Sequence, residues 1–534
     1  MKVAGLVAVA CVVLGWQAAA LQRSGPRLGQ EVAVPRHLQD GEELKLSAPA
    51  LVAFGRALFE AQWTDQDGGG RPLSKGTGRA VTDVAQPLRG SRAFNRISGP
   101  DANSCQGCHN APYGITGGGG DFVTSGFEQA DRFDFVTFEA GDTQATRGAL
   151  DESTQAVSLQ TVGHARSTPG LFGAGYLEML ARQMTDDLQR IRDALAPGES
   201  RPLVSKGVSF GSLARHADGR WDVSAVQGLS EPSVAIASGR SKPSLVIRPW
   251  QQAGRAVSLR EVTNDALNRH HGMQSIERFG SGTDPDGDGI FNEMTRADVT
   301  ALTVFQAVLP VPGRVIANDA DIERAVWNGE QLFERIGCST CHVPALPLDR
   351  NGWIYSEPNP YNPEGNLQPR NGRGFRVDLA DASLPVPRLR PADGQAQALQ
   401  IPAYTDFRLH DIGDADAPAT DRRFLTRRLW GAANEPPYFH DGRFTTMRQA
   451  VLAHAGEAQA QRLAFERLTK YEQDSVIEFL KSLQVLPPGT NDLVVDEHYR
   501  RRDWPPRPPA NQSGALARLR LRPSSMREAW APPR

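Results

Sequence analysis

The chain has 534 residues, a formal net charge of −2 and 22% charged residues. This length exceeds what one hydrophobic core normally supports, so we expect at least two domains. The near balance of charge excludes the strongly basic surface typical of nucleic-acid binding, and it gives no reason to expect an acidic membrane surface as partner. Gly and Pro number 52 and 38, below the low-complexity range, which favours a globular protein with many loops.

Residues 1–20 are predicted to be a signal peptide. One Lys precedes a short apolar run, and Ala18 and Ala20 occupy the small-residue positions of a cleavage site. We therefore expect cleavage after Ala20 and export to the periplasm. A membrane anchor is the alternative, but the apolar run is short for a span. Because no later stretch approaches the length of a span, we expect no stable membrane insertion.

Removal of residues 1–20 leaves four cysteines, and all of them lie in two Cys-x-x-Cys-His motifs, "CQGCH" and "CSTCH". This motif is the covalent attachment signature of c-type haem, in which the histidine binds the iron. A thioredoxin-like pair would need no His, and a zinc site would need the two motifs to converge. The sequence therefore predicts two covalently bound haems, held by Cys105, Cys108 and His109 and by Cys338, Cys341 and His342.

The approach to each motif indicates how the chain is divided. Residues 54–60 and 328–334 share Gly-x-x-Leu-Phe-Glu, which is typical of the opening helix of a cytochrome c domain. Near the end of the second copy, apolar residues at helical spacing predict a terminal helix that packs on the opening one. We expect a mainly α fold of two cytochrome c-like haem domains with long irregular loops. The predicted units are a signal peptide (1–20), an N-terminal c-type haem domain with an insertion (45–315), a C-terminal cytochrome c domain (321–486) and a Pro/Arg-rich surface or disordered tail (487–534).

A ligand for the first haem is predicted in "SLREVTNDALNRHHGMQS". Ser258 and Glu261 form a capping box, and one apolar helix face leads to His270. His270, His271 and Met273 are all candidates for the sixth iron position, which could also be open, and we select His271 as the working choice. A histidine pair with a purely structural role is the alternative.

An acidic loop follows at "DPDGDGIFNE". Asp284, Asp286 and Asp288 alternate in the way that wraps oxygen ligands around calcium in an EF-hand loop. The bidentate acid at the twelfth position is missing, because Thr295 stands there and Glu293 comes two residues early. Calcium binding and an acidic surface turn are therefore both consistent with this stretch.

A ligand for the second haem is predicted in "HDGRFTTMRQAVLAHAGEA". Thr446 and Gln449 form a capping box, and His454 falls on the same helix face as Met447, Ala450 and Val451. A buried histidine satisfied by a backbone carbonyl is the alternative, but a metal with a vacant position in the same domain favours ligation by His454. His440, in the preceding turn, is expected to be a neighbour of the haem or of its carboxylates.

The haem motifs, "ALNRHHGMQS", "YTDFRLHDIGD" and "LWGAANEPPYFHDGRFTTMRQAVLAHAGEA" resemble the di-haem oxidoreductase family, whose members are often labelled thiol oxidoreductases. That family is related to the bacterial di-haem cytochrome c peroxidases, and the resemblance covers residues 51–486. In those peroxidases a Met on the helix after the "HDG" turn binds the second haem. His454 stands at the matching position here, and a His/His haem should be less oxidising than a His/Met one.

The resemblance also implies an activity. It points to Glu178, in "HARSTPGLFGAGYLEML", as the acid/base that a peroxidase needs on the open face of its iron; a solvated helix acid or an ion-pair partner is the alternative. We expect an exported di-haem c-type oxidoreductase that reduces a small oxidant such as hydrogen peroxide, with electrons from a soluble cytochrome c or cupredoxin. A pure electron-transfer protein and a di-haem oxygenase or protein-modifying enzyme are the alternatives.

Overall fold

The computed structural model describes residues 28–70, 102–120, 127–129, 163–165, 167–284, 288–349, 353–369, 374–389, 398–414 and 422–505. The predicted signal peptide lies outside these residues. The helices in this part of the chain are α2 (Ala48–Glu60), α3 (Cys105–Cys108), α5 (Ala174–Asp193), α6 (Glu231–Val234), α7 (Leu259–His271), α8 (Ile276–Phe279), α9 (Arg296–Ala307), α10 (Ala320–Arg335), α11 (Met447–Leu452), α12 (Gln459–Glu466) and α13 (Lys470–Ser482).

Fourteen short strands form six small sheets in the described residues. They are β1 (Phe127–Gln129) with β2 (Gly163–Ala165); β3 (Ser200–Ser205), β4 (Val208–Arg215) and β5 (Trp221–Asp222); β7 (Leu346–Asp349) with β10 (Ala398–Ile401); β8 (Ile354–Glu357) with β9 (Phe375–Asp378); β11 (Leu409–Asp411) with β12 (Arg423–Leu425); and β6 (Gly313–Val315) between β13 (Leu483–Gln484) and β14 (Val494–Val495).

The expectation of a mainly α fold is wrong. Helix accounts for 34% of the described residues and strand for 14%. The strands were not predicted from the sequence because most of them are two to four residues long. An alternating apolar pattern cannot be recognised over so short a stretch. β8, for example, buries only its second and fourth residues.

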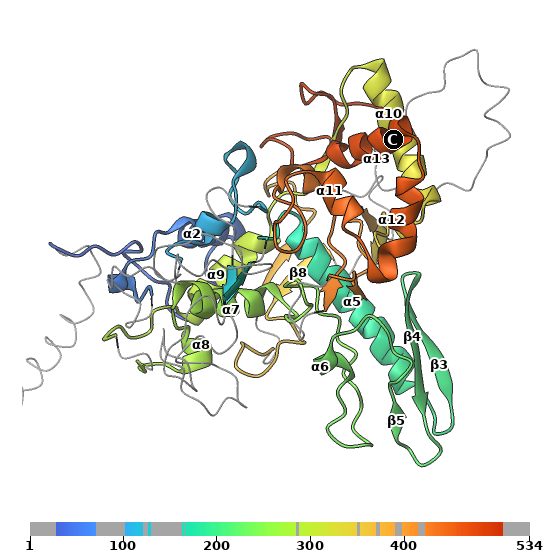
Figure 1. Ribbon diagram of the computed structural model, residues 1–534. Coiled ribbons are helices and arrows are strands. Elements are labelled where there is room, and N and C mark those ends of the chain that lie inside the picture. The colour runs from blue at the N-terminus through green and yellow to red at the C-terminus, as the bar shows by residue number, and fades with distance from the viewer. Residues whose placement is uncertain are drawn as a thin grey trace, which may run out of the picture.

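Two groups of helices occupy different parts of the molecule (Figure 1). α2 packs on α9 in the N-terminal part, and α10 packs on α13 in the C-terminal part, which confirms the predicted terminal helix. Glycine allows both approaches: a Cβ on Gly55 would come within 2.0 Å of the Ala301 carbonyl oxygen, and one on Gly329 within 1.9 Å of that of Ser475.

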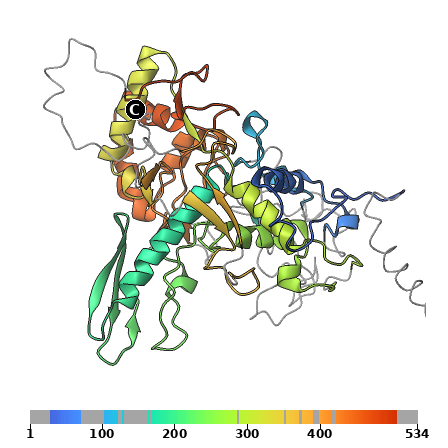
Figure 2. The ribbon, with the colours of Figure 1, turned by 180° about the vertical axis from the view of Figure 1, so that it is seen from behind.

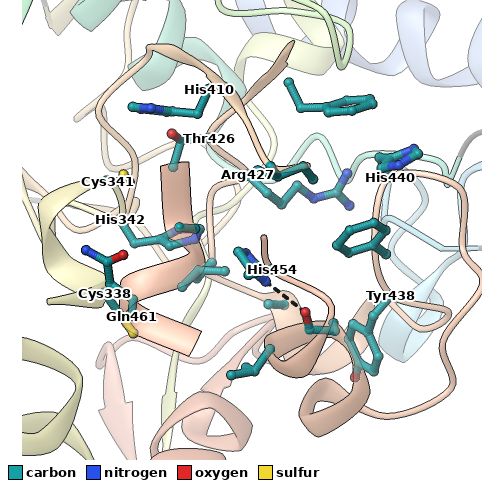
Figure 3. Close-up of a pocket in the computed structure, with 18 of the residues that line it drawn as sticks. Cys338, Cys341, His342, His410, Thr426, Arg427, Tyr438, His440, His454 and Gln461 are labelled. Atoms are coloured by element: carbon teal, nitrogen blue, oxygen red, sulfur yellow. Dashed lines mark hydrogen bonds between the residues drawn. The ribbon is translucent and has the colours of Figure 1, made fainter. Parts of the chain in front are cut away.

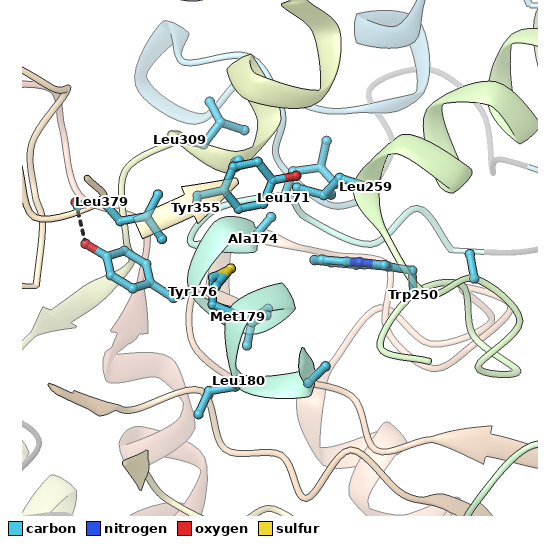
Figure 4. Packing of buried hydrophobic residues seen from close by; sticks show 14 of the residues in the cluster. Leu171, Ala174, Tyr176, Met179, Leu180, Trp250, Leu259, Leu309, Tyr355 and Leu379 are labelled. Carbon is cyan, nitrogen blue, oxygen red and sulfur yellow. Dashed lines mark hydrogen bonds between the residues drawn. The ribbon is translucent and has the colours of Figure 1, made fainter. Parts of the chain in front are cut away.

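The long helix α5 runs between these groups, and the β3–β4–β5 sheet projects beyond its C-terminal end (Figures 1 and 2). The first half of α5 is buried in the main core, where Tyr176, Met179 and Leu180 pack with residues of other segments (Figure 4). The Tyr176 hydroxyl donates to the Leu379 carbonyl at 2.7 Å, so the ring is buried without an unsatisfied polar atom. No helix in the described part of the chain has the length and apolar character needed to cross a membrane.

Residues 487–505 are part of the fold, although the sequence predicted a surface or disordered tail from residue 487. β14 pairs in parallel with β6, and Trp504 is only 5% exposed. The Trp504 indole donates to Glu330 at 2.9 Å, and the Arg314 guanidinium lies 4.8 Å from the Trp504 ring centroid while pairing with Glu330 at 3.0 Å. The sequence did not predict the buried position of Trp504, because the segment is rich in Pro and Arg and a single buried aromatic residue gives no periodic pattern. Residues 506–534 lie outside the described part.

We expect Trp504→Ala to lower the free energy of unfolding by about 3–5 kcal/mol, the cost of removing a buried aromatic side chain. The Glu330 carboxylate would also lose a donor inside the core. Denaturant unfolding followed by circular dichroism measures this change, and Tyr499→Phe, at an exposed position in the same segment, is the control. An unfolding free energy within about 1 kcal/mol of the wild type would contradict a structural role for this segment.

Candidate haem sites

A cavity of about 240 Å³ lies in the C-terminal part of the molecule, and it contains Cys338, Cys341, His342 and His454 (Figure 3). α10 ends immediately before the motif, and Gly337, with φ of 86°, turns the chain so that the two cysteines follow. Most of the remaining wall is apolar, including Phe333, Phe439, Met447, Val451 and Leu480. This lining suits a large, mainly apolar cofactor.

The two histidines face each other across this cavity, with ring centroids 6.4 Å apart. Nδ1 of His342 donates to the Tyr404 carbonyl at 3.2 Å. Nδ1 of His454 donates to the Ala450 carbonyl at 2.8 Å (Figure 3). A carbonyl can only accept, so each Nε2 is left without a proton and can bind a metal. The backbone carbonyls thus fix one tautomer of each ring, an arrangement that suits a metal ligand as well as a structural histidine.

Burial keeps both imidazoles neutral. Removal from water, reinforced by the neighbouring His454, lowers the pKa of His342 to about 4. Burial also lowers the pKa of His454 below its ordinary value. α11 ends at Leu452, two residues before His454, but the His454 amide still donates to the Val451 carbonyl at 3.3 Å, which prolongs the turn. The predicted helix face therefore carries His454 into the cavity even though the helix is shorter than expected.

His410 also lines this cavity, and the sequence analysis gave it no role. Its Nε2 lies 2.8 Å from Asp406 and its Nδ1 lies 2.7 Å from Glu457. Burial alone would lower the pKa of His410, but hydrogen bonds to Asp406, Cys341 and Glu457 raise it to about 10. Asp406 and His410 lie close enough to Cys341 to form a metal-ligand cluster, but Cys341 belongs to the haem motif. The i,i+4 spacing of Asp406 and His410 within "YTDFRLHDIGD" was the sequence signal that could have indicated this pair.

His440 lies where the sequence predicted it, among the residues that line the C-terminal cavity. Its ring stacks on Phe424 with centroids 4.1 Å apart, and its Nε2 is hydrogen-bonded to Asp414. Arg443 also pairs with Asp414, at 3.0 Å. His440 is therefore a neighbour of the cavity whose Nε2 is engaged by a carboxylate.

A second cavity, of about 190 Å³, lies in the N-terminal part and contains Cys105, Cys108 and His109. Phe59 of α2 packs on the His109 ring at 5.5 Å between centroids. One face of α7 covers the cavity with Val262, Thr263, Ala266, Leu267, His270 and His271. The helix predicted from its capping box is therefore present, and the Ser258 hydroxyl accepts from the Glu261 amide at 3.0 Å.

The histidines of this cavity have the same Nδ1 anchoring as those of the other one, and Nε2 of His271 lies 3.4 Å from the Cys105 sulfur. Nδ1 of His109 donates to the Gly118 carbonyl at 3.0 Å, and Nδ1 of His271 donates to the Ala102 carbonyl at 2.7 Å. Burial lowers the pKa of His109 to about 4, and the nearby His271 contributes to that shift. His270 also lines the cavity, whereas Met273 is buried in the core and is not among the described lining residues. The structure thus brings both candidate histidines to the site and favours His271 by its fixed tautomer.

The remaining groups of both cavities fit a haem. All four described cysteines are free thiols, and burial raises the pKa of Cys105 and of Cys338 to about 12. In the N-terminal cavity, Arg428 Nη2 and Trp250 Nε1 are buried donors without a hydrogen-bond partner in the described part of the chain. The two carboxylates of a haem are acceptors of the kind that these donors lack.

Glu178 lies elsewhere. It is fully buried on α5, and it is not among the described residues that line either cavity. One carboxylate oxygen accepts from Arg182 at 2.5 Å and from Asn359 at 2.8 Å, and the other accepts from the Leu259 amide at 2.7 Å. Leu259 is the first residue of α7, so Glu178 caps that helix. This placement supports the ion-pair alternative and gives no support to the role of distal acid.

The acidic loop is fastened by its own backbone. Asp284 accepts from the amides of Asp288 and Gly289 at 3.1 and 3.0 Å, and Asp288 accepts from the Ile290 amide at 2.7 Å. Thr295 caps α9, and Glu293 accepts from the Gln274 amide at 2.6 Å. Asp286 lies outside the described residues, so calcium binding by Asp284, Asp286 and Asp288 stays a prediction of the sequence.

Comparison with known proteins supports the family resemblance. Residues 393–483 match the family model described as "Di-haem oxidoreductase, putative peroxidase". Cytochrome-c peroxidase IdrP2 of Denitromonas iodatirespirans is 22% identical over 270 residues, which is 46% of this chain and 69% of that protein. The predicted resemblance is therefore confirmed, and the matches support an oxidoreductase of the di-haem, peroxidase-like class with haem as cofactor.

Solved structures were also compared. Hydrazine synthase of Kuenenia stuttgartiensis is 15% identical with a TM-score of 0.25, over 52% of this chain and 78% of that one. A MauG-like protein associated with microbial copper homeostasis is 17% identical with a TM-score of 0.23, over 59% of this chain and 89% of that one. Both TM-scores are too low to support an argument from structure.

We expect Glu178→Gln to lower the free energy of unfolding by about 3 kcal/mol, because it removes the nearer of two carboxylates that balance the buried Arg182. Glu466→Gln, which breaks a surface pair with Arg462 at 3.0 Å, should change it by less than about 1 kcal/mol. Denaturant unfolding of both variants measures the difference. A Glu178→Gln protein with wild-type stability and peroxide turnover lowered by about 10²–10⁴ would restore the catalytic role.

Proposed function

We propose that this chain is an exported di-haem c-type cytochrome that passes electrons to a small oxidant, with hydrogen peroxide as the substrate. The observation that carries the proposal is the paired arrangement of four histidines. His109 with His271, and His342 with His454, line two cavities that each contain a Cys-x-x-Cys-His motif, and every Nδ1 is held by a backbone carbonyl. When bound, c-type haem supplies iron that changes oxidation state by one electron.

In the C-terminal cavity the protein's part is to hold two neutral imidazoles on opposite sides. The anchoring carbonyls of Tyr404 and Ala450 keep His342 and His454 in one tautomer, and the apolar wall excludes water. Two imidazole ligands leave no position for a substrate. We assign this cavity the storage and relay of an electron.

In the N-terminal cavity the protein can also handle a proton. Asp265 is the carboxylate among the described residues that line it, and it accepts from Gln251 at 3.0 Å and pairs with Arg278 at 2.5 Å. One turn before it, Glu261 has its pKa raised to about 7 by burial and by the charge of Asp265. Glu261, beside Asp265, can therefore give up or accept one of the two protons that reduction of peroxide consumes.

The oxidant needs access to the N-terminal iron, so His271 would act as a removable ligand there. α7 ends at His271, and Gly272 follows with φ of 66°. A ligand at the end of a helix can be displaced without unwinding the turns that precede it. The proposed donor of electrons is a small cytochrome c or cupredoxin, and the proposed compartment is the periplasm.

A second function is favoured by the same four histidines. If His271 stays bound, both irons are fully ligated and the chain is a pure electron-transfer protein. The two functions differ in whether a site for the oxidant opens during reduction.

The proposal is tested by a peroxide titration of the half-reduced protein, produced in a host that matures c-type cytochromes, followed by absorbance and electron paramagnetic resonance. We expect two covalent haems, a low-spin C-terminal centre in both redox states, and a high-spin N-terminal centre that reacts with peroxide after one-electron reduction. Two low-spin centres whose spectra do not change on addition of peroxide would instead support a pure electron-transfer protein. A protein without covalent haem would overturn both.

Asp265→Asn should lower peroxide turnover by about 10²–10⁴ while haem content and both low-spin signals of the oxidised protein are kept, because the amide removes the charge that helps to raise the pKa of Glu261. Asp218→Asn is the matched control, since Asp218 is an exposed carboxylate that is not among the described lining residues of either cavity. Steady-state peroxide reduction with a reduced cytochrome c measures the difference. Equal turnover in Asp265→Asn and the wild type would remove Asp265 from the proton path.

A further inference from the structure

The two cavities meet at a short wall. Ser167 and Gln252 line both of them, and the Gln252 side chain donates to the Ser167 carbonyl at 2.8 Å. The next segment of this wall contains Glu435, which lines the C-terminal cavity and is 7% exposed. A charged carboxylate in such a position needs partners, because burial of an unpaired charge is costly.

Two glycines form the space that holds this carboxylate. A Cβ on Gly119 would come within 2.4 Å of the Glu435 carboxyl carbon, and a Cβ on Gly170 would come within 2.0 Å of its Oε1. Gly119 follows the first haem motif, and Gly170 lines the N-terminal cavity. No side chain larger than hydrogen fits at either place without moving Glu435. The carboxylate of a C-terminal segment is thus seated in backbone that belongs to the N-terminal haem site.

Two successive arginines flank it and face different cavities. Arg427 lines the C-terminal cavity and pairs with Glu435 at 2.5 Å. Arg428 lines the N-terminal cavity. Burial lowers the pKa of Arg428 to about 10, although the charge of Glu435 acts to raise it, so Arg428 is a cation at neutral pH. The Glu435 carboxylate therefore pairs with Arg427 and acts through its charge on Arg428, and these two cations line different cavities.

Hydrogen bonds tie the same segment to a histidine of the N-terminal site. Asn110, which follows His109, donates through its side chain to the Asn434 carbonyl at 2.9 Å. The carbonyl that anchors His109 belongs to Gly118, next to Gly119. Glu435 is therefore held in a fixed position relative to both sites.

We propose that Glu435 is a shared positioning residue that sets the reduction potentials of both haem centres at once. The inference rests on the proposed function, because it requires a redox group in each cavity. A negative charge favours the oxidised state of an iron, which carries one more positive charge than the reduced state. Arg427 and Arg428 favour the reduced state, and the Glu435 carboxylate offsets both of them.

The test is a spectroelectrochemical titration of the haem-loaded protein with redox mediators. In Glu435→Gln, both midpoint potentials should rise by about 59 mV, which is a tenfold change in each one-electron equilibrium constant, because both arginines lose their counter-charge. Arg427→Gln should lower both midpoints, because it frees the carboxylate from its partner. The Arg427 side chain is 33% exposed, so this second variant tests the proposal even if the first folds poorly.

Glu457→Gln is the matched control. Glu457 lines the C-terminal cavity alone, and its side chain is half-exposed where it meets His410; its removal should move one midpoint only. A Glu435→Gln protein with wild-type haem content in which either midpoint is unchanged would overturn the inference. Absence of covalent haem from the wild type would instead overturn the proposed function, so the two failures are distinguishable.

Discussion

The candidate sites depend on one repeated interaction, a hydrogen bond from an imidazole Nδ1 to a backbone carbonyl. It occurs at His109, His271, His342 and His454. Because a carbonyl can only accept, the bond fixes both the tautomer and the direction of Nε2. Three of the four carbonyls come from other loops or chain segments, so the ligand geometry is a product of tertiary packing and not of the motifs themselves. Ala450, one turn before His454, is the local exception.

The packing that supplies these carbonyls also brings the two sites together. Ser167, Gln252 and Glu435 form a wall between the two cavities. In this wall, segments that follow the first haem motif meet segments that precede α11. Glycine makes this proximity possible, since side chains at Gly119 or Gly170 would occupy the place of the Glu435 carboxylate. A short distance between redox centres is what electron transfer between them requires. Because the two cavities share this wall, a charge beside one proposed haem centre would also change the reduction potential of the other.

Local signals in the sequence predicted the chemistry better than the architecture. A five-residue motif and a capping box identify His342 and His454 without knowledge of the fold, because both depend on neighbours within a few residues. The fold class was wrong because the strands are too short to show a pattern, and the anchor at Trp504 was missed because it is a single residue. The surroundings of Glu178 could not be predicted for another reason: its position on a helix can be recognised from sequence, but two of its partners, Leu259 and Asn359, lie more than 80 residues away.

The buried charges around Glu178 have their own physical logic. Arg182 and Arg260 are shared among the carboxylates of Glu178, Glu357 and Glu277, and burial, with the nearby Glu178 charge opposing the arginines, raises the pKa of Glu357 to about 7. Such clusters seldom stabilise a fold more than apolar packing would. This one instead links α5 to the start of α7 and to β8, and α7 carries His271 at its other end. Apolar side chains could fill that space, but their contacts are not directional. Hydrogen-bonded ion pairs are directional and therefore favour one arrangement of the three elements. The first residue of α7 is therefore held by a polar cluster outside the described lining of both cavities, and His271 lies at the opposite end of that helix.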